Sequence, residues 1–420
     1  MTSVPFAKPD HVPAELVRDY DHVNGPEIMA FPPAAIDQVR DVGRPTFFSS
    51  FHGGFWVLTR YEDIRAAFLD AELFPQWGRG IPENPFDRVF IPLNLDPPEH
   101  RPYRRLMTPL FSPGRVAKLD PIVRGVARDR IAELAGQDGC EFVHDFALVL
   151  PGANFCGMLG LPVSEFANFN RMAMDLIYAP ALVRKEQGDD AAKAAQRAAS
   201  QKIEAFIGDL VTRRQRERGD DVISVLLDSQ VDGRPLTVEE VHNITNLLFF
   251  AGTDSTAAML AYAFAFLAEH PGHRRWIIDN PDRVGGAVDE LIRFHGFHHI
   301  TRVASRDAEF AGVRMKKGDL LVLPTGGANH DPREFPSGDQ VSFTRSNASH
   351  HVTFGGGIHR CLGAPLATLQ LRIALEEFHR VIPGYELAPA GAEFVSGRSK
   401  TIPQFVPLRF TRMVTDNETA

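Results

Sequence analysis

The chain has 420 residues, of which 44% are hydrophobic and 23% are charged, as is typical of a soluble globular protein. Its 45 basic and 53 acidic residues give a net charge of −8, so no general attraction to nucleic acid or to an anionic membrane is expected. Three cysteines, at 140, 156 and 361, are too few for a disulfide framework and indicate a reducing, cytoplasmic setting.

The N-terminal part predicts an irregular segment followed by short elements. The first residues lack the basic-then-apolar order of a signal peptide, and residues up to about 45 are rich in proline. FWVLTR at 55–60 predicts a strand, and YEDIRAAFLD at 61–70 predicts a helix. Proline and glycine throughout 74–98 predict a long loop, and loops of this length inside compact domains are usually functional.

From residue 114 to 330 the pattern is mainly helical. Thr237 and Glu240 have capping-box spacing before an apolar run that need not end before His270. Such a helix has about 34 residues and a length of roughly 50 Å. It is apolar nearly all round, so we expect it to cross the middle of the fold, and polar residues 253–256 make it a poor membrane span.

After residue 300 the sequence predicts short strands within 309–325, then loops, then a helix at about 363–381. The fold class expected is therefore mainly α with a minor β region. We expect residues 1–420 to form one domain.

A cysteine stands in a glycine-rich loop, HVTFGGGIHRCLGAPLA, at 351–367. The three glycines permit unusual backbone conformations and close approach of another group. The helix that follows favours an anion, so the sulfur of Cys361 should ionise more easily, and Phe354 and Leu362 make its surroundings apolar. A thiolate in apolar surroundings suits a soft metal, whereas a lone cysteine is otherwise most often a small buried hydrophobe.

A zinc cluster is an alternative interpretation of the same stretch. Its ligands would be His350, His351, His359 and Cys361, but their spacing fits zinc-binding pairs badly and no second cluster exists.

The loop resembles the haem-binding signature of the cytochrome P-450 family, F-G-x-G-x-x-x-C-x-G, through Phe354, Gly355, Gly357, Cys361 and Gly363. The resemblance implies the cytochrome P-450 fold, with its long central helix over haem b, and Cys361 as the axial ligand of the haem iron. In this family the thiolate donates electron density that favours O–O cleavage.

A second motif, DELIRF at 289–294, places Glu290 and Arg293 three residues apart on a helix. By itself this is an ordinary surface ion pair. It also resembles the family's E-x-x-R, which implies a buried structural pair completed by a third partner, for which Arg345 is the candidate.

The long helix supplies a third motif. FFAGTDSTAAM resembles the family's [A/G]-G-x-[D/E]-T over the distal haem face. The resemblance implies that Ala251 and Gly252 leave room for dioxygen and that Asp254 and Ser255 relay protons. The usual threonine is replaced by Ser255, so Thr256 is a further candidate. The structural alternative is that these hydroxyl groups donate hydrogen bonds to carbonyl groups of their own helix.

A fourth motif, DPPEHRPYRRLM at 96–107, resembles the bacterial camphor hydroxylase branch. His100 and Arg104 share a helical face and are expected to reach a haem propionate. By the same resemblance Arg302 and His359 are further propionate contacts.

The resemblance implies a monooxygenase that uses O₂ and NAD(P)H to hydroxylate, or oxidatively dealkylate, a small apolar substrate. Electrons would come from a separate [2Fe–2S] ferredoxin with its NAD(P)H-dependent reductase, docking on Arg101, Arg105 and Arg360. We expect a cytoplasmic monomer without a nucleic-acid or membrane partner. A peroxide-driven enzyme should lack the acid–alcohol pair, and a haem-binding sensor would not need it.

The expected substrate is a terpenoid or a small aromatic compound in an apolar pocket. Two polar candidates, Arg88 and His298, would bind a carbonyl, hydroxyl or carboxylate of that substrate. The alternative for Arg88 is that its side chain faces solvent. The apolar candidates are Trp77, Phe86, Val89, Leu247, Leu248, Ala251, Phe297 and Ile402.

Overall fold

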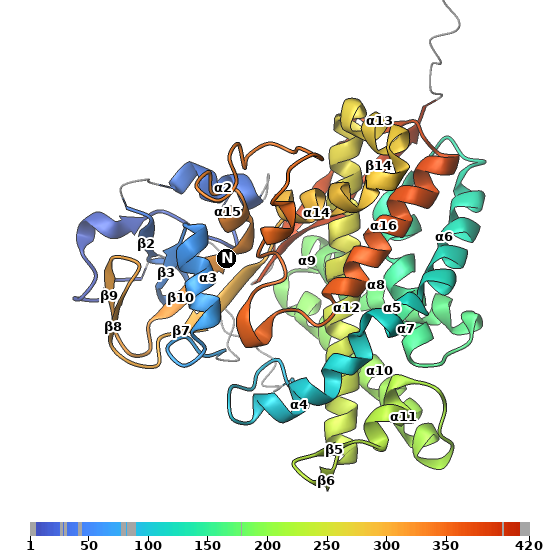
Figure 1. The fold of residues 1–420 in the computed structure, drawn as a ribbon, viewed down its shortest axis with the longest axis horizontal. Coiled ribbons are helices and arrows are strands. Elements are labelled where there is room, and N and C mark those ends of the chain that lie inside the picture. The colour runs from blue at the N-terminus through green and yellow to red at the C-terminus, as the bar shows by residue number, and fades with distance from the viewer. Residues whose placement is uncertain are drawn as a thin grey trace, which may run out of the picture.

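The computed structural model describes residues 6–25, 28, 32–40, 44–76, 81, 90–177, 179–396 and 399–411. Within them the fold has a helical part and a smaller β part, and a long helix stands between the two (Figure 1). The expected class, mainly α with a minor β region, is confirmed.

The α-helices are α2 Pro32–Val39, α3 Tyr61–Leu69, α4 His100–Met107, α5 Pro113–Ala117, α6 Asp120–Leu134, α7 Val149–Met158, α8 Phe166–Ile177, α9 Ala179–Gln187, α10 Asp189–Arg216, α11 Val222–Leu227, α12 Val238–Glu269, α13 Pro271–Asp279, α14 Val284–Phe294, α15 Thr325–Asn329 and α16 Ala364–Val381. The strands are β1 Val17–Arg18, β2 Thr46–Ser49, β3 Phe55–Leu58, β4 Gly139–Glu141, β5 Gln230–Val231, β6 Arg234–Pro235, β7 His299–Val303, β8 Ala308–Phe310, β9 Val313–Met315, β10 Leu320–Pro324, β11 Tyr385–Leu387, β12 Glu393–Ser396, β13 Thr401–Phe405 and β14 Pro407–Phe410.

Helix α12 is the predicted long helix, with 32 residues and a length of about 48 Å. It begins with the predicted capping box: the Thr237 hydroxyl accepts from the N–H of Glu240 at 3.1 Å, and the Glu240 carboxylate accepts from the N–H of Thr237 at 2.7 Å. The helix is long and apolar enough to cross a membrane, but 67% of its most apolar window is buried inside the fold. It packs against α7, α10 and α16, as the core helix of a helical layer does.

The main sheet has the order β1-β2-β3-β10-β7. Strand β3 pairs antiparallel with β2 and parallel with β10, and β10 pairs antiparallel with β7. All four residues of β3 are buried, because Trp56 and Leu58 join one apolar cluster and Phe55 and Val57 join another. A continuous apolar run is what a strand covered on both faces requires.

Most predicted elements are confirmed, including α3, β3, β8 to β10 and α16. The expectation that the first 45 residues are irregular is wrong in part, because this region contains β1 and α2. Helix α2 begins with two prolines, which read as helix breakers but fit the first turn of a helix, where no N–H partner is needed. In the predicted loop at 74–98, residues 77–80 and 82–89 lie outside the described residues, and the described remainder has neither helix nor strand.

Candidate functional site

Cys361 lies between a short 3₁₀ turn, Gly357–His359, and the first residue of α16. Its N–H donates to the Phe354 carbonyl at 2.9 Å, which closes the loop. The backbone N–H groups of Gly363 and Ala364 approach the sulfur, as predicted for the start of a helix. Part of the surface of Cys361 is exposed, so a small molecule can reach it, although protein atoms surround the residue on most sides.

The expectation that the Cys361 sulfur ionises easily is not borne out for the protein alone. Burial raises the pKa of the thiol, and it outweighs the opposing effects of the Gly363 and Ala364 N–H groups and of Arg104 and Arg360. The nearby N–H groups and arginines therefore favour the thiolate but do not outweigh burial. A bound metal cation deprotonates a coordinating thiol outright, so we expect Cys361 to ionise when it binds a metal.

The glycines of the loop adopt unusual backbone conformations and allow a close approach, as the sequence predicts, and the group that approaches is helix α3. Gly355 and Gly357 adopt left-handed φ angles of 67° and 62°, which favour glycine. A Cβ atom on Gly357 would lie 2.2 Å from the carbonyl oxygen of Phe68 in α3, and one on Gly356 would lie 2.9 Å from the Phe68 Cβ. The glycines thus allow the loop to pack tightly on α3, which fixes the position of Cys361.

A histidine pair lies next to this loop. The rings of His100, from α4, and His359 lie 4.5 Å apart, and His359 Nε2 is 3.1 Å from a carboxylate oxygen of Asp96. His100 is 2% exposed, and its Nδ1 has no hydrogen-bond partner among the described residues. Burial, with the charges of His359 and Arg104, lowers the pKa of His100 to about 4, so its ring is neutral near pH 7.

Two arginines accompany the pair. Arg302, in β7, is 4% exposed and donates to the side chain of Gln76. Burial lowers its pKa to about 10, and the charge of Asp96 opposes this. Arg104 donates to the Arg360 carbonyl, and its charge interacts with Cys361.

These residues fit the haem that the resemblance implies. A sulfur ligand, a buried imidazole nitrogen without a partner, and two guanidinium groups can satisfy an iron and the carboxylates of a porphyrin. Neither arginine has a carboxylate within ion-pair distance among the described residues, and a buried cation without one needs such a partner.

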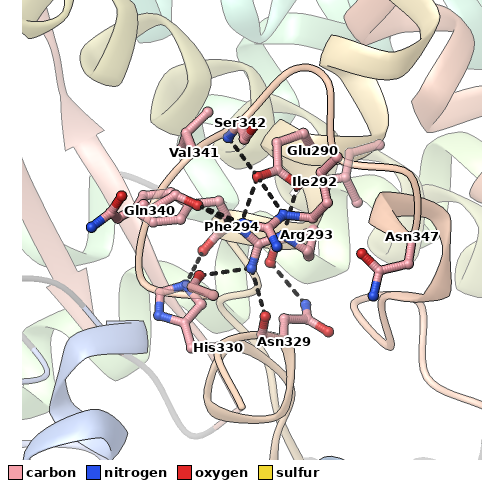
Figure 2. A network of polar contacts seen from close by, with 12 residues as sticks. Glu290, Ile292, Arg293, Phe294, Asn329, His330, Gln340, Val341, Ser342 and Asn347 are labelled. Atoms are coloured by element: carbon pink, nitrogen blue, oxygen red, sulfur yellow. Dashed lines mark hydrogen bonds and ion pairs between the residues drawn. The ribbon is translucent and has the colours of Figure 1, made fainter. Parts of the chain in front are cut away.

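The E-x-x-R pair is buried, as predicted. Arg293 Nε and a Glu290 oxygen lie 2.7 Å apart, and both side chains are 0% exposed (Figure 2). Arg345 is the third partner, with its Nε 3.0 Å from the other Glu290 oxygen. Arg293 also donates to the carbonyls of Asn329, at 2.6 Å, and Gln340, at 2.9 Å. Each of the three charged groups therefore has hydrogen-bond partners, which buried ions need in order not to destabilise a fold.

The same network reaches the cysteine loop. The Asn329 amide donates to the Arg293 carbonyl at 2.9 Å and to the Thr353 hydroxyl at 2.8 Å, and its oxygen accepts from the N–H of Val352 at 2.8 Å. The Thr353 hydroxyl donates to the Ile292 carbonyl at 2.7 Å. Because Thr353 directly precedes Phe354, the network positions the start of the cysteine loop.

The middle of α12 differs from the relay that the resemblance implies. Ala251 and Gly252 are exposed within the mostly buried middle of the helix, as an open distal face requires. The Ser255 hydroxyl, however, donates to the Ala251 carbonyl of its own helix at 2.8 Å, which is the structural alternative to a relay role. No hydrogen bond joins it to Asp254 among the described residues. Asp254 instead pairs with Lys400, whose Nζ lies 2.6 Å from its carboxylate.

Lys400 belongs to the connection between β12 and β13, which pack as a hairpin near α12. Lys400 forms an isolated antiparallel bridge with His298. The Tyr262 hydroxyl of α12 donates to the Thr401 carbonyl at 2.9 Å. The hairpin, the middle of α12 and the segment before β7 therefore meet at one place.

Several predicted substrate residues lie at this meeting place. His298 stacks on Phe297 with ring centres 4.4 Å apart, and burial with the charge of Lys400 lowers the pKa of His298 to about 3. Phe297 and Ile402 are buried, at 2% and 5% exposure. Leu247 is buried and Leu248 partly buried on α12. The other candidates, Trp77, Phe86, Arg88 and Val89, lie outside the described residues.

Sequence reasoning missed Asp96 and Lys400. Asp96 stands in the D-P-P-E stretch, where its position beside His100 was a usable signal. Lys400 is 146 residues from Asp254 in the chain, and no local pattern indicates that pairing. The three arginines predicted to dock the redox partner, Arg101, Arg105 and Arg360, are all exposed.

Comparison with known proteins agrees with this geometry. A family model described as cytochrome P450 matches residues 163–380. The probable cytochrome P450 127A1 of Sinorhizobium fredii is 34% identical over 400 residues, which cover 93% of each chain. Mycinamicin IV hydroxylase/epoxidase of Micromonospora griseorubida is 33% identical over 340 residues, which cover 79% of this chain and 83% of that protein. The crystal structure of cytochrome P450 CYP101C1 superposes with a TM-score of 0.87 at 30% identity, over 97% of this chain and 100% of the other.

Proposed function

This chain belongs to the cytochrome P450 family and is a bacterial haem-thiolate monooxygenase, and we propose that its substrate is a small terpenoid or aromatic compound that it hydroxylates or oxidatively dealkylates. The observation that carries the proposal is the accessible Cys361 in a loop fixed by the buried Glu290–Arg293 network. We expect residues 1–420 to act as one haem-binding unit.

Haem b, bound through the Cys361 thiolate, supplies the iron chemistry that activates O₂. In our proposal His100, Arg104, Arg302 and His359 hold its propionates. The desolvated arginines favour anionic partners, and the neutral ring of His100 donates a hydrogen bond without adding charge. Phe354, Gly355 and Gly363 shape the cysteine side of the site.

Protons would reach the distal face through α12. Asp254 is the acid of the proposed relay, and Ser255 and Thr256 are its hydroxyl groups. Ala251 and Gly252 leave the helix surface open beside them. Because Asp254 is paired with Lys400 and Ser255 is bonded to its own helix, a rotation of either side chain is needed before a proton passes between them.

We propose that electrons come from an acidic [2Fe–2S] ferredoxin served by an NAD(P)H-dependent reductase in the cytoplasm. The exposed Arg101, Arg105 and Arg360 lie near the cysteine loop, since Arg104 of α4 donates to the Arg360 carbonyl. A local basic patch steers an acidic partner even when the net charge of the whole protein is −8. We expect the enzyme to act as a monomer.

The apolar side chains Leu247, Phe297 and Ile402 favour a hydrocarbon substrate. His298 adds a polar group whose Nδ1 has no hydrogen-bond partner among the described residues. It is therefore our candidate for a carbonyl or hydroxyl group of the substrate.

The first test compares wild type with Cys361→Ala. After reduction and addition of CO, wild type should show the red-shifted band of thiolate-ligated haem, and the variant should show neither that band nor product formation. Wild type with ferredoxin, reductase and NADH is then tested on terpenoid and aromatic panels. Product formation that needs peroxide but not NADH would contradict the proposal, and so would a haem that gives the band but oxidises neither class.

A further inference from the structure

A second cluster of metal-binding side chains lies in the β part of the fold and contains none of the residues assigned to the haem. Asp21 and His22 follow β1, and His52 lies in the short 3₁₀ turn between β2 and β3. One ligand atom from each of the three lies within 4.8 Å of the others. Two imidazoles and one carboxylate are the ligand types that zinc and similar dications prefer.

His22 is already oriented as a metal ligand. Its Nε2 lies 2.9 Å from the Ile81 carbonyl, and the residue is 0% exposed. In a neutral ring that Nε2 carries the proton, so the lone pair is on Nδ1. Ligating histidines usually donate their second ring nitrogen to a backbone carbonyl in this way.

Asp21 is also held in place. Its Oδ1 accepts from the N–H groups of Val23, at 2.9 Å, and Asn24, at 3.0 Å, and lies 2.6 Å from His52 Nε2. These hydrogen bonds fix the orientation of the Asp21 carboxylate. His52 has a left-handed backbone, with φ 51°, which non-glycine residues rarely adopt.

His299, the first residue of β7, is an independent observation that points to a ligand. It is 2% exposed, and neither ring nitrogen has a hydrogen-bond partner among the described residues. Its ring lies 5.6 Å from that of His22. Leaving both nitrogens of a buried imidazole unpaired is costly, and a water held on a nearby metal would give one of them a partner.

We propose that Asp21, His22 and His52 bind a first-row transition-metal dication, for which Zn²⁺ is the probe, and that His299 is the hydrogen-bond partner of a water on that metal. Binding exchanges the Asp21–His52 hydrogen bond for bonds from both residues to the metal, and His52 Nε2 gives up its proton to Nδ1 or to solvent. The ligand atoms close to about 3.4 Å, the edge of a tetrahedron with ~2.1 Å bonds.

The site would join three segments that are distant in sequence, namely the turn after β1, the β2–β3 connection and the start of β7. Strand β7 also carries Arg302, and His22 contacts Ile81 in the predicted substrate loop. Metal binding would therefore stabilise the β part of the fold rather than take part in the reaction.

The test uses haem-loaded, tag-free protein, treated with a chelator and then titrated with Zn²⁺ by calorimetry. We expect one equivalent of zinc to bind, zinc to raise the thermal unfolding temperature, and the Soret band to stay unchanged. His52→Asn removes the imidazole and keeps a residue that tolerates a left-handed backbone, and Asp21→Asn removes the carboxylate. Each should weaken zinc binding at least tenfold.

His11→Ala is the matched control, because His11 pairs with Asp319 at 2.8 Å but no third ligand is grouped with them among the described residues. It should bind zinc like wild type. The proposal is overturned if zinc does not bind, if His52→Asn and Asp21→Asn bind it as wild type does, or if binding shifts the Soret band, which would place the zinc at the haem site.

Discussion

At the residue scale, the buried Glu290–Arg293 pair has partners for both of its charges. Arg293 is fully buried and donates to the Glu290 carboxylate and to the Asn329 carbonyl, and Arg345 donates to the same carboxylate. A buried ion pair adds little stability by itself, but loss of one partner leaves the other charge unpaired. The pair therefore acts as a positioning device, and its hydrogen bonds continue through Asn329 to the cysteine loop.

Arg293→Met should destabilise the protein by about 3–5 kcal/mol, because Glu290 would keep a buried charge without its main partner. The free energy of unfolding, from urea titration followed by circular dichroism, checks this. Arg409→Met is the control: Arg409 pairs with Glu386 at the surface, where such pairs contribute about 0–1 kcal/mol. A similar small loss in both variants would contradict the structural role of Arg293.

Which single residues can be predicted from the sequence depends on how local their chemistry is. The Cys361 loop and the Glu290–Arg293 pair are recognised because all their fixed positions lie within a few residues of one another. The partners Lys400 and Asp96 are not, since each meets its group only after the chain has folded. The raised pKa of Cys361 was missed for the same reason, because burial is a property of the fold and not of the motif.

At the element scale, an ion pair joins the central helix α12 to the β12–β13 hairpin. Asp254 and Lys400 are 2.6 Å apart, with side chains only 16% and 23% exposed, and Asp254 Oδ1 has no hydrogen-bond partner among the described residues. The hairpin that carries Ile402, a substrate-pocket candidate, is thus paired with Asp254, the acid of the proposed proton relay. A change in the hairpin should therefore change the position of the Asp254 side chain.

Lys400→Met should reduce the free energy of unfolding by about 1–3 kcal/mol, because it leaves a largely buried carboxylate without its donor. It should also change the fraction of NADH electrons that end as peroxide instead of product, because Asp254 is no longer held toward the hairpin. Urea titration and peroxide assay measure the two effects. Lys316→Met, which breaks the exposed pair with Asp307, should change neither.

If both lysine variants behave alike, the ion pair does not couple the hairpin to α12. A loss of stability with unchanged peroxide formation would limit Lys400 to fastening the hairpin and remove it from the control of Asp254.

Elements were predictable where local signals agree. Helix α12 has a capping box and a long apolar pattern. Helix α16 begins directly after the motif that ends at Gly363, and its own second residue is a proline. Helix α2 was missed because its two initial prolines suggest a break. Strand β1, with two residues, is set by its parallel partner β2 and has no sequence signal of its own.

At the scale of the whole molecule, several histidines are held uncharged by their surroundings. Burial lowers the pKa of His295, His298 and His379 to about 3 and that of His100 and His351 to about 4. All five rings are therefore neutral in the folded protein at pH 7, whereas in the unfolded chain they titrate near 6.5. The stability of the whole fold should therefore begin to fall near pH 6.5, above the usual pKa values of Asp and Glu.

The sign follows from the lowered values. Between pH 6.5 and about 4 these histidines bind protons in the unfolded chain but not in the folded protein, so acid favours unfolding. The stability contributed by neutral burial is fully present above pH 6.5 and is lost as the pH falls toward the folded pKa. Each such histidine lowers the free energy of unfolding by about 1.4 kcal/mol per pH unit in this window.

His295→Phe tests this at one position. His295 stacks on Tyr262 with ring centres 5.4 Å apart and planes 19° apart, so phenylalanine keeps an aromatic ring there. Relative to its own value at about pH 8, the variant should lose ~2 kcal/mol less stability at about pH 5 than wild type. His350→Gln, at an exposed position, should follow the wild-type curve. Parallel wild-type and His295→Phe curves would show that the ring at 295 takes up its proton in the folded state, and acid sensitivity would then have to come from the carboxylates.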